Sequence, residues 1–245
     1  MLGKSSKKEK EETVDLRDPE EIRKEEKRAR IRARIRAFHR QQLRKKVKYV
    51  YLALAVFLTD QLSKWYVMEY VIRPRTHNGG ESMGFFDWYI HTPYVLRFPA
   101  ALKVLPFFNV VMVWNYGISF GLLGSFSKFG YIILIVIALA IIALFCLWMY
   151  EAKTREYMIP YALVIGGALG NVIDRFRFQA VMDFLDFHSN GVHFWAFNVA
   201  DMAVVTGVVS IIGISQYKTT NRKKRYRKNY KERQKKVYRY GNVGR

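Results

Sequence analysis

Cysteine is nearly absent from this chain, which excludes internal disulfides as a source of stability. The one cysteine, Cys146, lies within an apolar run, so we interpret it as a packing residue rather than a reactive thiol. Metal-binding spacings are also missing, because His188 and His193 form the only near pair and no H-E-x-x-H pattern occurs. No phosphate-binding loop or dinucleotide fingerprint is present. The sequence therefore predicts a protein that uses no metal and no cofactor.

Acidic residues are scarce at the two ends of the chain, where basic residues accumulate. Residues 1–48 contain 18 Lys and Arg against 9 Asp and Glu, and residues 218–245 contain 13 against 1. The net charge of +21 therefore belongs to the ends, and only 10 of the 41 basic residues lie between them. A mean hydropathy of −0.08 hides this partition. The apolar body between the ends indicates a membrane domain.

Four segments of this body are candidates to cross a bilayer. The clearest is Tyr131–Tyr150, which contains no charge and, at about 1.5 Å per residue, matches a hydrocarbon core of about 30 Å. The other three are Tyr49–Ile72, Tyr157–Ile173 and Phe197–Tyr217, and each carries polar residues. The first follows a long charged region and has no A-x-A site after it, so it is expected to be an uncleaved span. The expected fold class is an all-α polytopic membrane protein with four transmembrane helices.

The basic residues predict the orientation of these spans. Both ends of the chain and the short link that carries Lys153 and Arg155 are rich in Lys and Arg, whereas 73–127 and 176–196 are poorer. The positive-inside rule then places both termini in the cytoplasm. We expect a basic N-terminal tail over 1–46, a four-span domain over 47–217 and a basic C-terminal tail over 218–245.

The longer outer segment is too polar to span the membrane, and its composition predicts β structure. Residues 108–120 are rich in β-branched and aromatic side chains and end in a glycine turn, which is typical of a strand followed by a turn. We therefore expect a small extracytoplasmic β platform within about 73–127. In the third span, Gly166 and Gly170 form a small-xxx-small step that favours close helix contact.

Polar side chains that are far apart in the sequence converge on the outer face in this topology. Asn171, Asp174 and Arg175 lie at the outer end of the third span, and Asn198 and Asp201 lie at the start of the fourth. Their i, i+3 and i+4 spacing puts each set on one helix face. Ionisable residues near hydrocarbon are costly and indicate function. The other members of this predicted cluster are Asp60 and Lys64 in the first span, Asn115 and Gly117 before the second span, and Asp183 between the last two spans.

The residues alone leave several functions open. Several neighbouring carboxylates are typical of proton chemistry, as in hydrolysis by a carboxylate pair. The same carboxylates would suit a proton-coupled transporter, although they cluster at one face and no internal repeat is visible. A membrane scaffold with buried polar residues between its helices is the third possibility. Asp186, close to Asp183, is interpreted as a solvated loop charge.

Five ordered motifs resemble those of the lipoprotein signal peptidases, also called signal peptidase II. They are TDQLSKW with Asp60 and Lys64, NYGISFG (115–121), GGALGNVIDR (166–175), VMDF (181–184) and FNVAD (197–201). Together they cover about residues 47–217 in the family's order and with its number of spans. The chain departs from the family's pattern in three places. Gln179 or Ala180 stands where a glycine is usual, Met182 replaces a valine, and Trp195 replaces a proline.

The resemblance implies an aspartyl endopeptidase of the bacterial inner membrane. Such an enzyme removes the signal peptide from prolipoproteins by cutting just before the diacylglyceryl-cysteine. The matching positions imply that Asp183 and Asp201 are the catalytic pair, at the outer face. The resemblance implies that the other matched residues order the site or contact the substrate: Asp60, Lys64, Asn115, Gly117, Asn171, Asp174, Arg175 and Asn198.

The basic ends lie outside this resemblance. Residues 20–48 have the composition of a charged helix. Basic charge next to the first span favours contact with anionic lipid headgroups over contact with nucleic acid. The simplest interpretation is solvated charge that fixes the topology.

Overall fold

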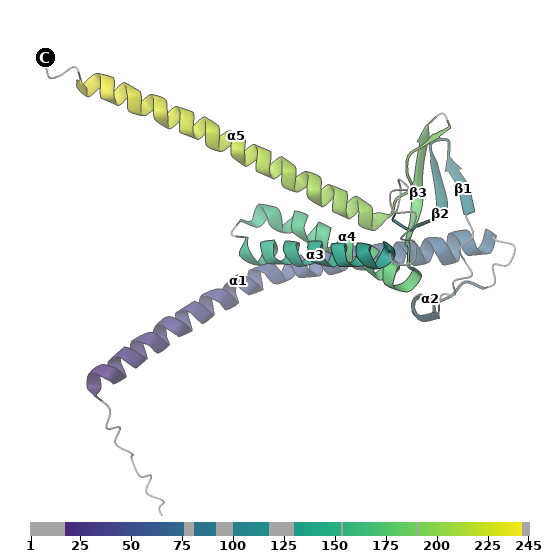
Figure 1. Cartoon of the computed structure of the whole chain (residues 1–245), viewed down its shortest axis with the longest axis horizontal. Coiled ribbons are helices and arrows are strands. Elements are labelled where there is room, and N and C mark those ends of the chain that lie inside the picture. The colour runs from purple at the N-terminus through teal and green to yellow at the C-terminus, as the bar shows by residue number, and fades with distance from the viewer. Residues whose placement is uncertain are drawn as a thin grey trace, which may run out of the picture. The chain divides into compact units, whose positions relative to one another are not determined.

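The structure is a computed structural model of the chain, which divides into two units, residues 1–45 and residues 46–245. It is shown in Figure 1. The described residues are 18–75, 81–91, 100–117, 130–152, 154–189 and 191–241. Parts of the predicted platform, namely 76–80, 92–99 and 118–127, lie outside them.

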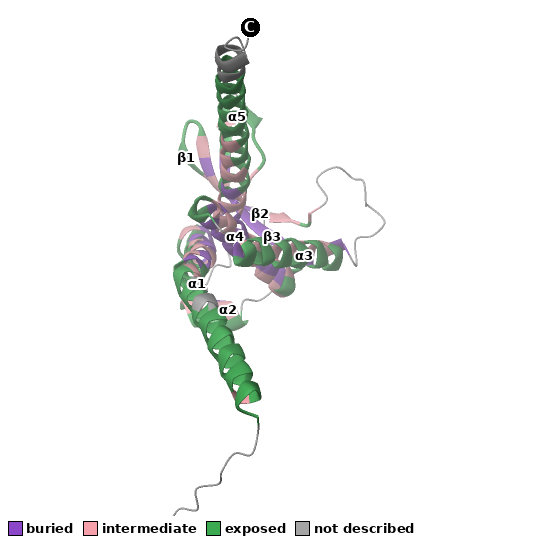
Figure 2. Ribbon diagram, turned by 90° about the vertical axis from the view of Figure 1, so that its left-hand side faces the viewer, coloured by how far each residue is buried: buried purple, intermediate pink, exposed green. Residues whose placement is uncertain are grey.

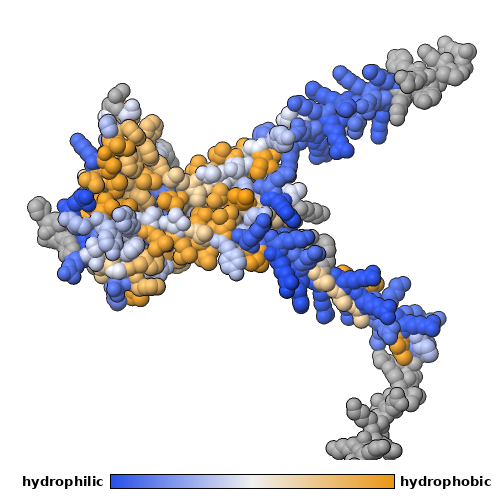
Figure 3. Space-filling view, turned by 180° about the vertical axis from the view of Figure 1, so that it is seen from behind, coloured by the Kyte–Doolittle hydropathy of each residue, from blue (hydrophilic) through white to orange (hydrophobic). Residues whose placement is uncertain are grey.

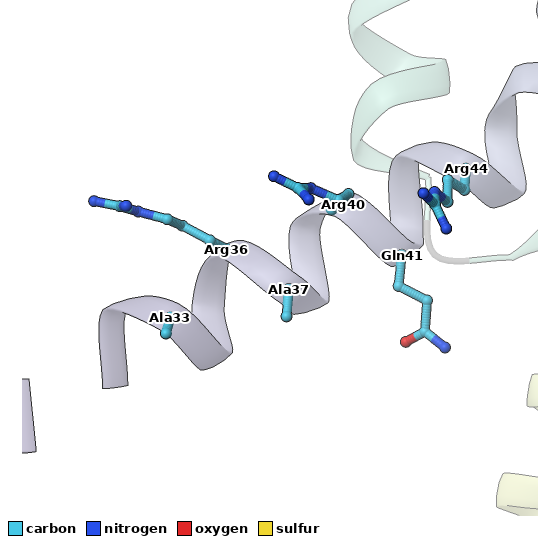
Figure 4. Close-up of a pocket in the computed structure, with 6 residues that line it drawn as sticks. All are labelled: Ala33, Arg36, Ala37, Arg40, Gln41 and Arg44. Atoms are coloured by element: carbon cyan, nitrogen blue, oxygen red, sulfur yellow. The ribbon is translucent and has the colours of Figure 1, made fainter. Parts of the chain in front are cut away.

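Helix α1 (Pro19–Tyr66) begins in the first unit, and the predicted charged helix over 20–48 is confirmed. The Asp18 carboxylate caps its start by accepting a hydrogen bond from the Glu20 backbone N–H at 2.9 Å. Further along, Arg36, Arg40 and Arg44 lie four residues apart, which places them on one side of the helix. Figure 4 shows their side chains.

In the second unit, α1 continues to Tyr66 and then widens into a π-helix, η1 (Val67–Ile72), followed by the short 3-10 helix η2 (Arg73–Arg75). Glu69 is fully buried inside the π-helix. Its carboxylate accepts two hydrogen bonds from the Arg73 guanidinium, at 2.5 and 2.8 Å. This bidentate pair satisfies a charge that would otherwise be costly to bury.

Three of the described helices are long and apolar enough to cross a membrane. They are α3 (Gly130–Glu151), the segment Arg155–Phe178 that joins η4 (Arg155–Tyr157) to α4 (Met158–Phe178), and the first part of α5 (Val199–Gly241). The expected span Tyr49–Ile72 is helical but is not among them. Polar residues at Asp60, Gln61 and Lys64 interrupt its apolar run.

Helix α4 is the packing centre of the bundle, and its glycines explain why. A Cβ on Gly166 would lie 2.4 Å from the Ala53 carbonyl oxygen of α1, and one on Gly167 would lie 2.4 Å from the Ala200 carbonyl oxygen of α5. The predicted close contact is thus confirmed at Gly166 by the α1 backbone, and at Gly170, where a Cβ would lie 2.4 Å from the Asp60 carboxylate of α1. Figure 2 shows buried residues concentrated where these helices meet.

A small antiparallel sheet lies at the end of the bundle where α5 begins (Figure 1). Its order is β1 (Ala100–Leu105), β2 (Phe108–Asn115), β3 (Val181–Ser189) and β4 (Val192–His193). The predicted strand over 108–120 is therefore found as β2, and Gly117 follows it with a positive φ of 82°. Half of the sheet, however, comes from the segment between α4 and α5, where the sequence predicts a loop.

Two local features join the sheet to the helices. Helix α4 ends at Phe178, and its C-cap residue Gln179 has a left-handed φ of 57°. The Gln179 N–H donates to the Arg175 carbonyl oxygen at 3.0 Å. Helix α2 (Phe85–His91) is held against the end of α4, because the Arg177 guanidinium lies 4.1 Å from the Trp88 ring centroid. Trp88 itself is fully buried.

The packing at Gly166 gives a prediction about stability. Gly166→Ala should lower the thermal unfolding midpoint in detergent, because the new methyl group collides with the α1 backbone and overpacking costs about 1–3 kcal/mol. Gly213→Ala in α5 is the matched control, since nothing lies within 4 Å of its Cβ position. An unchanged midpoint for Gly166→Ala would contradict the close approach of α1 and α4.

Candidate active site

A buried lysine between two carboxylates forms the base of the site. The Lys64 ammonium lies 2.7 Å from Asp60 Oδ2 and 2.7 Å from Asp174 Oδ2. The exposed fraction of all three side chains is 1% or less. Because one cation faces two anions, the cluster needs further hydrogen-bond donors to be stable away from water.

Those donors come from the backbone of α5 and β3 and from Gln61, the α1 residue next to Asp60. The Ala200 backbone N–H donates to Asp60 Oδ1 at 2.9 Å, and the Met182 N–H donates to Asp174 Oδ2 at 3.4 Å. Gln61 donates through Nε2 to Asp174 Oδ1 at 3.0 Å. The cluster therefore ties α1 and α4 to the start of α5 and to β3. Gln61 was not singled out from the sequence, although it follows Asp60 directly in the TDQLSK motif.

Asp201 is oriented by the N-terminus of α5. Asn198 is the N-cap residue, and its Oδ1 accepts a hydrogen bond from the Asp201 backbone N–H at 2.9 Å. In return, Asp201 Oδ2 accepts one from the Asn198 N–H at 3.3 Å. This reciprocal pair is a capping box with aspartate at its third helical position. The positive end of the helix dipole stabilises negative charge on Asp201.

Two amides connect Asp201 to the rest of the site. Asn171 donates through Nδ2 to Asp201 Oδ1 at 2.7 Å. Asn198 donates through Nδ2 to Asp183 Oδ1, also at 2.7 Å. Asn198 thus contacts both carboxylates of the predicted pair, that of Asp183 through its side-chain amide N–H and that of Asp201 through its backbone N–H.

Asp183 projects from β3 opposite Val113 of β2, next to an irregularity in the pairing between Val110 and Val113. A bulge of this kind re-aims side chains beside it. Asn115 of β2 donates through Nδ2 to Asp183 Oδ2 at 3.0 Å. Burial, together with the negative charge of Asp201, raises the pKa of Asp183 to about 7. Its neutral form is therefore available near neutral pH.

Asp186 lies on the same strand, but its pKa is shifted in the opposite direction. It is buried, and Asn109 Nδ2 and His193 Nδ1 lie 2.9 and 2.8 Å from its Oδ2. Desolvation acts to raise its pKa, but these hydrogen bonds, together with the charges of His193 and His188, outweigh that effect and lower the pKa below its ordinary value. The interpretation of Asp186 as a solvated loop charge was wrong, because the segment is a strand and β2 covers it.

Arg175 and Gly117 complete the set of predicted site residues. The positive charge of Arg175 interacts electrostatically with the carboxylates of Asp174, Asp201 and Asp183. The Gly117 N–H donates to Asn115 Oδ1 at 2.7 Å, and a Cβ on Gly117 would lie 3.8 Å from the Arg175 guanidinium. All ten predicted residues thus lie in one connected region, although they come from α1, β2, α4, β3 and α5.

An open groove of about 400 Å³ borders Asp183. Asn115 of β2 and Trp195, which precedes α5, lie on its wall. An extended peptide could lie along this surface with its backbone beside the carboxylate. The remaining residues that line the groove are Val113, Trp114, Tyr116 and Ala196.

Comparisons with known proteins agree with one another. The family model described as signal peptidase (SPase) II matches residues 52–216. A lipoprotein signal peptidase of Shewanella amazonensis is 34% identical over 71% of this chain and 90% of its own length. One of Nitrobacter hamburgensis is 42% identical over 46% of this chain and 71% of its own length.

A solved structure described as a bacterial membrane enzyme has the same fold, with a TM-score of 0.52 and 24% identity. It aligns with 71% of this chain and 90% of its own. The ordered motifs, the membrane helices with their small sheet, and these matches lead to one conclusion. The chain belongs to the signal peptidase II family, the lipoprotein signal peptidases of bacterial membranes.

Proposed function

We propose that this protein is an aspartyl endopeptidase that uses Asp183 and Asp201 as its catalytic pair. The observation that carries the proposal is that both carboxylates accept a hydrogen bond from Asn198 while their surroundings differ. Asp201 lies at a helix N-terminus that favours its charged form. Asp183 has a raised pKa of about 7. Hydrolysis by two carboxylates needs one ionised and one neutral group, and this geometry favours that division.

In the proposed reaction, a water molecule lies between the two carboxylates and the scissile carbonyl. Ionised Asp201 accepts a proton from the water as its oxygen attacks the carbonyl carbon. Neutral Asp183 gives its proton to the carbonyl oxygen, which forms a neutral gem-diol. Collapse of the gem-diol breaks the C–N bond, with the proton held on Asp201 passing to the leaving amine and the hydroxyl proton returning to Asp183. Both aspartates regain their starting states. Because the pair shares one proton, its two macroscopic pKa values belong to the pair.

The substrate class follows from family membership. We propose that the bond cut lies just before the diacylglyceryl-cysteine of a prolipoprotein, which would reach the groove beside Asp183 from the bilayer. The apolar residues bordering that groove suit a peptide that arrives from hydrocarbon. Arg175 and Asn171 would orient the two catalytic carboxylates. The buried ion cluster of Asp60, Lys64 and Asp174 would fix the positions of the helices and the strand that carry them.

The proposed placement is the bacterial inner membrane, with the site at the outer face. We propose that the second half of α1 crosses the bilayer as the fourth span, with its polar residues neutralised inside the bundle. Residues 47–217 would then form the peptidase domain, between cytoplasmic tails over 1–46 and 218–245. The basic link with Lys153 and Arg155 favours this orientation.

The catalytic pair can be tested by amide substitution. Asp183→Asn and Asp201→Asn should each lower cleavage of a lipidated prolipoprotein by a factor on the order of 10²–10⁴ or more, because an amide keeps the shape and loses the proton chemistry. Asp186→Asn is the control, since it removes a buried carboxylate from the same strand outside the pair. Mass spectrometry of the products gives the rates. Near wild-type cleavage by either of the first two variants would remove that residue from the pair.

The raised pKa of Asp183 predicts the pH dependence. Below about pH 7 Asp183 holds its proton, and above it the acid is lost, so kcat/KM should fall about tenfold per pH unit on the alkaline side. Asn115→Ala should move this limb to higher pH, because the Asn115 hydrogen bond stabilises the charged carboxylate and lowers the pKa of Asp183. A flat profile from pH 6 to 9 would contradict the role of Asp183.

Treatment with EDTA should leave the rate unchanged.

The proposed orientation can be tested by cysteine labelling in a Cys146→Ala background. A membrane-impermeant maleimide should label His91→Cys in intact spheroplasts and should label Glu20→Cys only after permeabilisation. The parent variant without cysteine is the control. Labelling of Glu20→Cys alone in intact spheroplasts would reverse the topology.

A further inference from the structure

Helix α5 does not end where its apolar part ends. It runs without a break from Val199 to Gly241, so residues 218–241 continue the membrane helix as one rod. Residues 218–235 contain ten Lys and Arg and one acidic residue, Glu232. Every residue from Thr219 to Lys235 is exposed. Figure 3 shows the hydrophilic surface of this part of α5 beside the apolar surface of its first half.

The length of the rod decides which partner its far end can reach. At about 1.5 Å per residue, residues 225–235 lie about 12–27 Å beyond Tyr217, where the apolar part ends. Headgroups extend only about 5–8 Å beyond the hydrocarbon. The field of anionic lipids falls off over a Debye length of about 8 Å at physiological salt. Lys218 and Arg222 can therefore contact headgroups, whereas the basic residues of 227–235 project into solvent.

The distribution of side chains around the rod also argues against a membrane surface. An interfacial helix needs an apolar stripe, and residues 218–235 contain no Leu, Ile, Val, Phe or Met. Their only large apolar groups are Tyr226 and Tyr230, which lie one turn apart, with exposed fractions of 71% and 55%. Exposed tyrosines among Lys and Arg are typical of surfaces that stack on nucleic-acid bases.

The base of the rod is neutralised and its far part is not. Lys218 lies 2.5 Å from the Glu156 carboxylate and contacts the Tyr157 ring at 4.5 Å. Among the described residues, none of the basic side chains from Arg222 to Lys235 pairs with a carboxylate. Like charges also recur four residues apart, as at Lys224 and Lys228, which destabilises an isolated helix. A bound polyanion would remove this repulsion.

We propose that the distal part of α5, residues 222–235, is an RNA-binding rod. Its Lys and Arg would contact phosphates, and Tyr226 and Tyr230 would stack on unpaired bases, which RNA offers in its loops. Binding would be independent of base sequence, because a single exposed helix offers no pocket for base edges. The inference rests on the cytoplasmic placement of the C-terminus proposed above, and it is separate from the peptidase chemistry. Binding of RNA by this rod would hold the peptidase near RNA in the cytoplasm, while the active site faces the opposite side of the membrane.

The test uses full-length protein in phosphatidylcholine nanodiscs and a fluorescein-labelled RNA hairpin. The distal variant carries Arg227→Gln, Lys228→Gln, Lys231→Gln and Arg233→Gln. We expect its Kd for the hairpin to rise at least tenfold. The slope of log K against log salt should fall by about 3, because four phosphate contacts are lost. Tyr226→Ala with Tyr230→Ala should weaken binding about fivefold or more through lost stacking.

The matched control removes four charges elsewhere, by changing Arg30, Arg32, Arg34 and Arg36 of α1 to Gln. It should leave the Kd within about twofold, and equal losses in both variants would show attraction by net charge alone and overturn the proposal. An unchanged Kd in the distal variant would also overturn it. Evidence for a lipid partner would overturn the proposal as well. In that result, wild-type protein bridges the discs to phosphatidylglycerol vesicles and the distal variant does not, while both bind the hairpin with equal affinity.

Cleavage of a lipidated prolipoprotein in the same discs separates this inference from the proposed function. The distal variant should cleave at the wild-type rate, and Asp201→Asn should bind the hairpin with wild-type affinity. Loss of cleavage without loss of RNA binding concerns the peptidase site alone. Loss of RNA binding without loss of cleavage concerns the rod alone.

Discussion

The buried ion cluster around Lys64 is the constraint on which the rest of the site depends. Two carboxylates face one ammonium at 2.7 Å each, in a part of the bundle closed to water. The excess negative charge can be stabilised only by N–H donors, and these come from the backbone at Ala200 and Met182 and from Gln61. Ala200 and Met182 belong to α5 and β3, whereas Gln61 joins α1 to α4. The hydrogen bonds to the two carboxylates therefore fix the starts of α5 and β3 relative to α1 and α4. Helix α5 carries Asp201, and strand β3 carries Asp183.

The same strand shows how surroundings decide the chemistry of a carboxylate. Asp183 and Asp186 are three residues apart on β3, and both are buried. Desolvation acts on both, yet the pKa of Asp183 rises to about 7 whereas that of Asp186 falls. Both accept side-chain hydrogen bonds that act to lower the pKa, but Asp183 also faces the negative charge of Asp201, which raises its pKa, whereas Asp186 faces His193 and His188, whose charges lower its pKa. Only the first arrangement leaves a carboxyl able to hold a proton near neutrality.

Helical spacing was enough to predict much of the site, since i, i+3 and i+4 steps place Asn171, Asp174 and Arg175 on one face. The fourth apolar run, expected to start at Phe197, likewise placed Asn198 and Asp201 at the start of a helix, and α5 begins at Val199. Other features depend on contacts between distant segments and could not be predicted from spacing. The strand character of 181–189 arises from pairing with β2, which lies about 70 residues earlier in the chain. The π-helix around Glu69 and the role of Gln61 depend on partners that no local pattern reveals.

The three departures from the family's pattern differ in consequence, and the structure gives the reason. Met182 acts through its backbone, with its N–H on Asp174 and its carbonyl oxygen accepting from Asn198, so a change of side chain leaves both contacts intact. Gln179 adopts the left-handed conformation that caps α4, which glycine would adopt with less strain. Trp195 alone places its altered side chain on the groove beside Asp183. Of the three departures, it is therefore the one whose side chain helps to shape that groove.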